Sequence, residues 1–192
     1  MAIRGLERGQ RAALIVNECQ NAIVSAEFST NAGLVSEVSS RGVLATIARL
    51  AAAFRAASLP VVHSTIVLRA DGVGMLDACL LLGVLRRKGG VVIGTPGAQI
   101  HLALKPNGTD YLSQRLHGLT PFHGTELEMV LRSQGVQTVV VAGVSTNVGV
   151  PVPASSWSIG ASLPWCRPRR VLATFECASS SGVATAAPDK AR

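Results

Sequence analysis

Short apolar runs alternate with stretches of helical periodicity over the first three quarters of the chain. Apolar runs that end in polar or glycine-containing turns predict buried strands, at residues 12–16, 59–67 and 137–142. A weaker strand signal, with more polar residues, lies at 110–115. Apolar residues spaced three and four apart predict helices, at 42–57, at 76–85 and after Gly124. Strands that alternate with helices are joined by parallel crossovers. The pattern therefore predicts an α/β fold, a Rossmann-like three-layer α/β/α arrangement with a mostly parallel, open sheet.

Two local signals refine this prediction. Thr125 is a residue type that favours the N-cap of a helix, and Glu126 and Glu128 would then lie in the first turn, where the helix dipole stabilises negative charge. In open parallel sheets, ligands bind at the carboxyl ends of the strands. The polar turn at 17–21, which follows the first strand, is therefore a candidate part of a binding site.

The last quarter of the chain has a different character. From Val152 onwards, prolines, serines and arginines follow one another without a period of 2 or 3.6, and residues 178–192 are rich in Ala, Ser, Gly and Pro. We therefore expect a main domain over residues 1–153 and a divergent, poorly ordered tail over residues 154–192. The sheet would end after its fourth strand and be incomplete on the C-terminal side, with one open flank.

Composition narrows the classes of function. The net charge is +7 with an isoelectric point near 10.1, but the charge forms no basic stripe and aromatic residues make up only 4% of the chain, so we expect no nucleic-acid partner. No apolar run is long enough to span a membrane, and the polar N-terminus lacks a signal-peptide core, which favours the cytoplasm. The four cysteines lack metal-site spacing, so we expect free thiols, no metal and no cofactor.

Three sequence motifs follow one another in a fixed order along the chain. Asn-Glu-Cys-Gln-Asn follows the first strand, and Phe-His-Gly-Thr-Glu-Leu and Gly-Val-Ser-Thr-Asn-Val-Gly-Val come later, at 122–127 and 143–150. Over residues 11–153 the chain resembles the isochorismatase-like cysteine hydrolase superfamily, which includes the nicotinamidases. That family uses an Asp–Lys–Cys triad, in which an activated thiolate has a base and a cation beside it.

The resemblance carries the triad to three altered positions. The family aspartate corresponds to Glu18, the family lysine, counted five residues before Phe122, to His117, and the family cysteine to Gly149. Glycine has no side chain, so covalent acyl transfer would lose its nucleophile, and only the binding and oxyanion-hole share of the rate would remain. The resemblance also implies a cis peptide and oxyanion donors near Val144–Ser145. It further implies substrate-binding residues, namely Gln20, Phe122, Val144, Ser145 and Thr146.

Several conspicuous side chains have a structural interpretation beside the functional one. Strand alternation points Cys19 away from Glu18, which favours a small buried thiol over a replacement nucleophile. Ser145 and Thr146 could serve as nucleophiles only with a base. His63 lies inside an apolar strand and is interpreted as a hydrogen-bonded core histidine. Asp71 and Asp77 flank a glycine-rich loop and are interpreted as turn and cap residues.

Three functions remain open. The first is a family hydrolase that acts on a small amide or a related C–N or ester bond, with its activity in question because of Gly149. The second is a non-catalytic protein that binds a small molecule, and the third is a non-functional truncated gene product. The resemblance also allows a homo-oligomer, since relatives are often oligomeric.

The unusual tail has a genetic interpretation. If the codons are GC-rich, as 15 arginines against 3 lysines suggest, a shifted reading frame from Ser156 onwards can encode a helix end and a Val-Val-Pro strand of the family type. We therefore hypothesise a frameshift near residues 151–155. Sequencing of the gene tests this hypothesis, because a single-base insertion or deletion should restore the strand.

Overall fold

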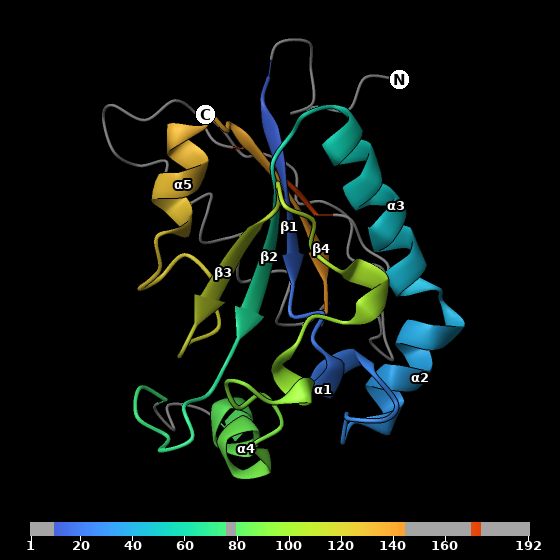
Figure 1. The fold of residues 1–192 in the computed structure, drawn as a ribbon, viewed down its shortest axis with the longest axis vertical. Coiled ribbons are helices and arrows are strands. Elements are labelled where there is room, and N and C mark those ends of the chain that lie inside the picture. The colour runs from blue at the N-terminus through green and yellow to red at the C-terminus, as the bar shows by residue number, and fades with distance from the viewer. Residues whose placement is uncertain (1–9, 76–79, 145–169, 174–192) are drawn as a thin grey trace, which may run out of the picture.

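A parallel sheet forms the centre of the molecule (Figure 1). The computed structural model describes residues 10–75, 80–144 and 170–173. In these ranges five strands pair in the order β3-β2-β1-β4-β5, and every pairing is parallel. The strands are β1 (Ala12–Asn17), β2 (Val61–Ile66), β3 (Tyr111–Arg115), β4 (Thr138–Gly143) and β5 (Arg170–Ala173). The predicted fold class, an open and mostly parallel α/β sheet, is confirmed.

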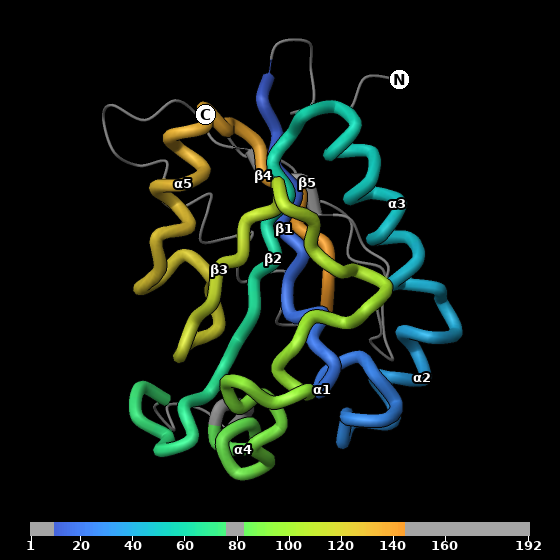
Figure 2. Tube along the Cα trace, in the orientation of Figure 1, coloured from blue at the N-terminus to red at the C-terminus, as the bar shows by residue number. Residues whose placement is uncertain are grey.

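Helices pack on both faces of the sheet. The bounds of the helices are α1 (Asn21–Val24), α2 (Ala32–Ser40), α3 (Val43–Ala56), α4 (Leu80–Lys88) and α5 (Leu127–Ser133). The even-numbered residues of β1 pack with Ile47 and Phe54 of α3, whereas its odd-numbered residues pack with Leu127 and Leu131 of α5. This alternation is the period of two expected for a strand, and it divides the core into two clusters. The Cα trace in Figure 2 shows α3 and α5 on opposite sides of the strands.

Close backbone contact fixes the end of β4. Gly143 has a φ of +143°, and a Cβ atom at this position would lie 2.1 Å from the carbonyl oxygen of Asn17. Any other residue would therefore push the ends of β1 and β4 apart. Val144, the next residue, donates its backbone N–H to the same Asn17 oxygen at 3.2 Å. The turn after β4 is thus held directly against the turn after β1.

Two predictions about elements were wrong. The sheet does not end at its fourth strand, because β5 pairs with β4 along the flank that we expected to be open. The N-cap of α5 is Glu126 rather than Thr125, so Glu126 precedes the first turn. Thr125 still provides the expected type of bond, since its hydroxyl accepts the N–H of Leu127 at 3.3 Å and donates to the carbonyl of Pro121. The described part of the helix predicted at 76–85 is α4, which continues to Lys88.

Candidate functional site

Glu18 lies directly after β1, at the carboxyl edge of the sheet, in a strained backbone conformation. Its φ is +54°, and within the described ranges only Ser58 shares a positive φ among non-glycine residues. Such a conformation costs about 1–3 kcal/mol and persists only where the surroundings impose it. Here the backbone N–H of Glu18 donates to the carbonyl of Ser64 on β2 at 2.8 Å. The positive φ ends the extended course of β1 at Glu18, at the edge of the sheet where ligands bind in such folds.

Arg115, the last residue of β3, forms an ion pair with Glu18. An Nη atom of Arg115 contacts Oε1 of Glu18. The Arg115 side chain is 1% exposed and the Glu18 side chain 19% exposed, so the pair has a buried cation and a carboxylate that reaches solvent. Nε of Arg115 also donates to the carbonyl of Gly118, and Nη1 donates to the hydroxyl of Ser64, both at 3.4 Å. The partly exposed carboxylate can accept a hydrogen bond or a proton from a bound molecule, and the buried cation holds it in place.

Arg115 was not among the residues predicted for the site, although one signal in the sequence pointed to it. The residue ends the third predicted strand, and the carboxyl ends of neighbouring parallel strands share one edge of the sheet. Its register partner on β2 is Ile66, and β2 separates β3 from β1. Only a long side chain can therefore reach from Arg115 to the end of β1. The assignment of His117 to the family lysine was made by counting five residues back from Phe122. Such a count does not show which side chain is long enough to contact Glu18.

His117 lies in the loop that follows β3. Its ring is 6.0 Å from the ring of His123, at an angle of 71°. A Cβ atom on Gly124, which has a φ of +70°, would lie 2.8 Å from Nε2 of His117, so this glycine makes room for the ring. The cation that contacts Glu18 in the structure is Arg115. That His117 takes the role of the family lysine stays a prediction.

Of the predicted substrate-binding residues, three lie in the part of the chain that the structure describes and two lie outside it. The side-chain amide of Gln20 is fully buried, with its two N–H donors on the carbonyls of Ile66 and Ala98 at 2.9 Å and its oxygen accepting the N–H of Ile66. Phe122 is partly buried against the α5 side of the core, and Val144 is fully buried on the α3 side. Ser145, Thr146 and Gly149 lie outside the described residues. These five binding assignments stay predictions, and Gln20 has no donor left for a ligand.

Two structural interpretations are confirmed. Cys19 is 2% exposed and belongs to the core cluster on the α3 side, with its thiol 3.5 Å from the carbonyl of Asn17. His63 is 1% exposed and bonded through Nε2 to Asp110 at 3.1 Å.

Within the described ranges, no three His, Cys, Asp or Glu side chains gather closely enough to hold a metal ion. No helix in those ranges has the length and hydropathy of a membrane span.

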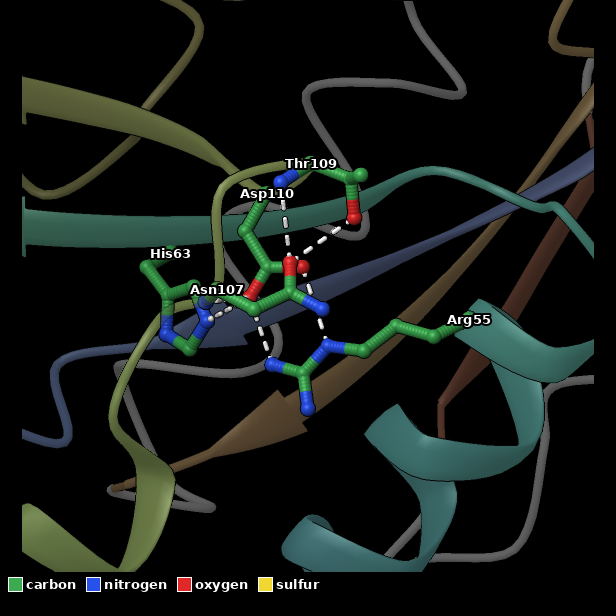
Figure 3. Close-up of polar contacts among 5 residues, drawn as sticks. All are labelled: Arg55, His63, Asn107, Thr109 and Asp110. Carbon is green, nitrogen blue, oxygen red and sulfur yellow. Dashed lines mark hydrogen bonds and ion pairs between the residues drawn. The ribbon is translucent and has the colours of Figure 1, made fainter.

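Asp110 lies at the centre of a second charged cluster, at the amino end of β3 (Figure 3). Its carboxylate accepts two N–H groups from Arg55 of α3, at 3.0 and 2.5 Å, and the backbone N–H of Asn107 at 3.1 Å. Burial alone would raise the pKa of Asp110, but the bonds from Arg55, Asn107 and His63 outweigh burial and lower it. Burial lowers the pKa of His63 despite the opposing bond to Asp110. This cluster ties α3 and β2 to the start of β3.

Comparisons with known proteins agree with the fold and with the motifs. The family model of the isochorismatase domain matches residues 12–156. A crystal structure of an isochorismatase family protein from Desulfovibrio vulgaris superposes with a TM-score of 0.66 at 28% identity, over 77% of this chain and 74% of that one. A cysteine hydrolase from Pseudomonas syringae has the same TM-score at 25% identity, over 76% of this chain and 65% of that one.

Sequence similarity to a curated protein is confined to a shorter segment. The isochorismatase family protein YecD of Escherichia coli O157:H7 is 39% identical over 61 residues, which are 31% of this chain and 29% of that protein. The family model, in contrast, extends over far more than half of the chain. With the matching sheet and helices, this extent places the protein in the isochorismatase family.

Proposed function

We propose that the protein binds a small amide, or a molecule with a related C–N or ester bond, and hydrolyses it slowly at the carboxyl edge of the sheet. The observation that supports this proposal is the ion pair between buried Arg115 and partly exposed Glu18. Proteins with a similar fold include the cysteine hydrolase from Pseudomonas syringae and an N-carbamoylsarcosine amidase from Thermoplasma acidophilum. A small-molecule substrate is therefore the expected partner.

The chemistry follows from the groups that remain. By the resemblance, Gly149 occupies the position of the family cysteine, so water has to replace the thiolate. Glu18 takes a proton from this water as its oxygen adds to the substrate carbonyl carbon. The same proton then goes to the leaving nitrogen or oxygen, which yields a carboxylic acid and an amine or alcohol. Without a covalent nucleophile, we expect a rate of about 10³–10⁴ over that of water, far below that of a complete triad.

Variants of Glu18 test the proposed base. A panel of small amides and esters should reveal slow turnover by the wild type. Glu18→Asp keeps a carboxylate and should retain turnover, whereas Glu18→Gln should lose about 10²-fold or more, as expected for removal of a general base. Circular dichroism checks that each variant is folded. Equal turnover by the wild type and a folded Glu18→Gln protein would refute the proposal.

Restoring the missing sulfur provides an independent test. Gly149→Cys should increase turnover of the best substrate by about 10²-fold or more if the acid and cation are still arranged to activate a thiolate. The alternative function, non-catalytic binding, is favoured by Gly149 itself. A compound that raises the melting temperature but is turned over by neither wild type nor Gly149→Cys would show a binding protein. Absence of both turnover and a thermal shift would indicate a non-functional gene product.

We further propose that the protein acts in the cytoplasm as a homo-oligomer, without nucleic acid. The scattered charge, without a basic stripe, supports the absence of a nucleic-acid partner, and the homo-oligomer rests on the family resemblance. Light scattering of the purified protein measures the oligomeric state. Residues 154–192 are proposed to be a divergent tail after a shift of reading frame, and β5 is the described part of that tail. Sequencing of the gene decides on this origin.

A further inference from the structure

Ser64 of β2 contacts both members of the acid–cation pair. Its backbone carbonyl accepts the N–H of Glu18 at 2.8 Å, and its hydroxyl accepts Nη1 of Arg115 at 3.4 Å. Ser64 is itself 1% exposed. We propose that Ser64 is a positioning residue that aims the Arg115 guanidinium at Glu18. This inference rests on the proposed function, because it concerns the same pair.

The order of the strands explains why this position matters. Arg115 starts on β3 and Glu18 follows β1, with β2 between them. Neighbouring strands lie about 4.8 Å apart, so the Arg115 and Glu18 side chains together have to span nearly 10 Å of sheet. Ser64 lies on β2 opposite Asn17 of β1 and Ser113 of β3. The guanidinium therefore passes over the middle strand at the level where Ser64 provides an acceptor.

The size and polarity of serine both fit this task. A larger side chain would fill the space that the guanidinium crosses, and an apolar one would leave a buried N–H of Arg115 without its acceptor. Arginine donates through a rigid planar fork, so each fixed donor constrains the direction of the others. The Gly118 carbonyl fixes Nε and the Ser64 hydroxyl fixes Nη1. With both in place, the remaining nitrogen is directed at Glu18.

Ser113 offers a matched control. It is the register partner of Ser64 on β3, lies on the same face of the sheet and is equally buried, at 1% exposure. Within the part of the chain that the structure describes, its hydroxyl has no hydrogen-bond partner. Replacing either serine by alanine removes one buried hydroxyl from neighbouring positions. A general effect of losing such a group would therefore appear in both variants, and a positioning effect only in the Ser64 variant.

The first measurement is nuclear magnetic resonance of the Arg115 guanidinium in the full chain. A fixed guanidinium rotates slowly about the Nε–Cζ bond, and Arg115→Met assigns the signals by removing them. We expect Ser64→Ala to speed this rotation by about fivefold or more, as for the loss of one hydrogen bond of typical strength, and Ser113→Ala to leave it unchanged. Equal rotation rates in the wild type and both variants would overturn the proposal. This readout needs no substrate.

The second measurement uses the best substrate of the amide and ester panel. Ser64→Ala should lower kcat about fivefold with an unchanged KM, because the cation is less well aimed during reaction. Ser113→Ala should retain the wild-type kcat, and equal kcat values for the two variants would contradict the inference. If even the wild type turns over nothing, the proposed function fails, and the guanidinium rotation rates alone decide on Ser64.

Discussion

The two ends of β3 each carry an arginine–carboxylate pair, and the pairs are mirror images in their exposure. At the amino end the carboxylate of Asp110 is buried, at 1% exposure, and the side chain of Arg55 is 25% exposed. At the carboxyl end the guanidinium of Arg115 is buried, at 1%, and Glu18 is 19% exposed. In the pair at the amino end, the member that reaches solvent is the cation, Arg55. In the pair at the carboxyl end, it is the carboxylate, Glu18. Only the second offers a ligand a group that can accept a proton.

The bonding of the two pairs differs in the same sense. The Asp110 carboxylate accepts hydrogen bonds from Arg55, from the backbone of Asn107 and from His63. Its hydrogen-bond acceptors are therefore engaged by groups of the protein itself. In Glu18 the contact with Arg115 is made through Oε1. A buried and fully bonded ion stabilises a fold only while its partners remain. A partly exposed ion can exchange its partner for water or for a substrate. We therefore expect the amino-end pair to determine stability and the carboxyl-end pair to determine function.

The largest expected effect comes from removing the exposed member of the amino-end pair. Arg55→Met would leave the Asp110 carboxylate buried without its main counter-charge, which should lower the free energy of unfolding by about 3–5 kcal/mol. Urea denaturation at pH 7 measures this loss. The matched control is Arg69→Met, which breaks an exposed pair with Asp71 and should leave the denaturation midpoint unchanged. A loss below about 1 kcal/mol in Arg55→Met would remove the distinction between the two ends.

The same substitution at the other end should have the opposite result. Arg115→Met would leave Glu18, which water can already reach, so the loss of stability should be at most about 2 kcal/mol, mainly from the hydrogen bonds to Ser64 and Gly118. Ligand-dependent thermal shift and turnover should fall strongly in this variant. In Arg55→Met, both should persist below the melting temperature. Loss of stability without loss of function in Arg115→Met would show that this pair, too, is only structural.

The sequence predicted the sheet better than it predicted this contrast. Three of the four predicted strands, β1, β2 and β4, are short apolar runs buried on both faces, and such runs are visible locally. The fourth, β3, is more polar and only partly buried. The fifth strand, Arg170–Ala173, was missed because its pairing with β4 is a non-local contact in a segment without a clear period. Helix α2 was missed because Ser and Gly dilute its apolar positions.

The candidate site shows the same limit. Glu18 follows from the motif after the first strand, since the turn and the strand are adjacent in the sequence. The partnership of Glu18 with Arg115 depends on strand order, register and the length of one side chain, none of which is a local property of the sequence. The Asp110 cluster likewise joins residues 47 and 55 positions apart. The sequence motif was enough to place Glu18 at the edge of the sheet. Which side chain contacts Glu18 there is determined by the tertiary structure.

The smallest expected effect concerns His63, the third member of the amino-end cluster. Burial lowers its pKa from 6.5 in the folded protein, so the unfolded chain binds a proton at a higher pH than the folded chain does. Lowering the pH through 6.5 should therefore destabilise the fold, by at most about 1.4 kcal/mol per pH unit from this one group. Asp110 contributes in the same direction only at lower pH, because its pKa is lowered from 3.8.

Between pH 7 and 5, His63→Gln should consequently flatten the decline in the free energy of unfolding, since glutamine does not titrate and can still donate to Asp110. Asp71→Asn is the control, because the bond from Arg69 lowers the pKa of Asp71 to about 2, well outside this range. Urea denaturation at several pH values gives the slopes. Parallel slopes in the wild type and His63→Gln would mean that His63 can take up its proton without leaving the cluster. The amino-end pair would then be as open to exchange as the carboxyl-end pair, and the contrast drawn from exposure would fail.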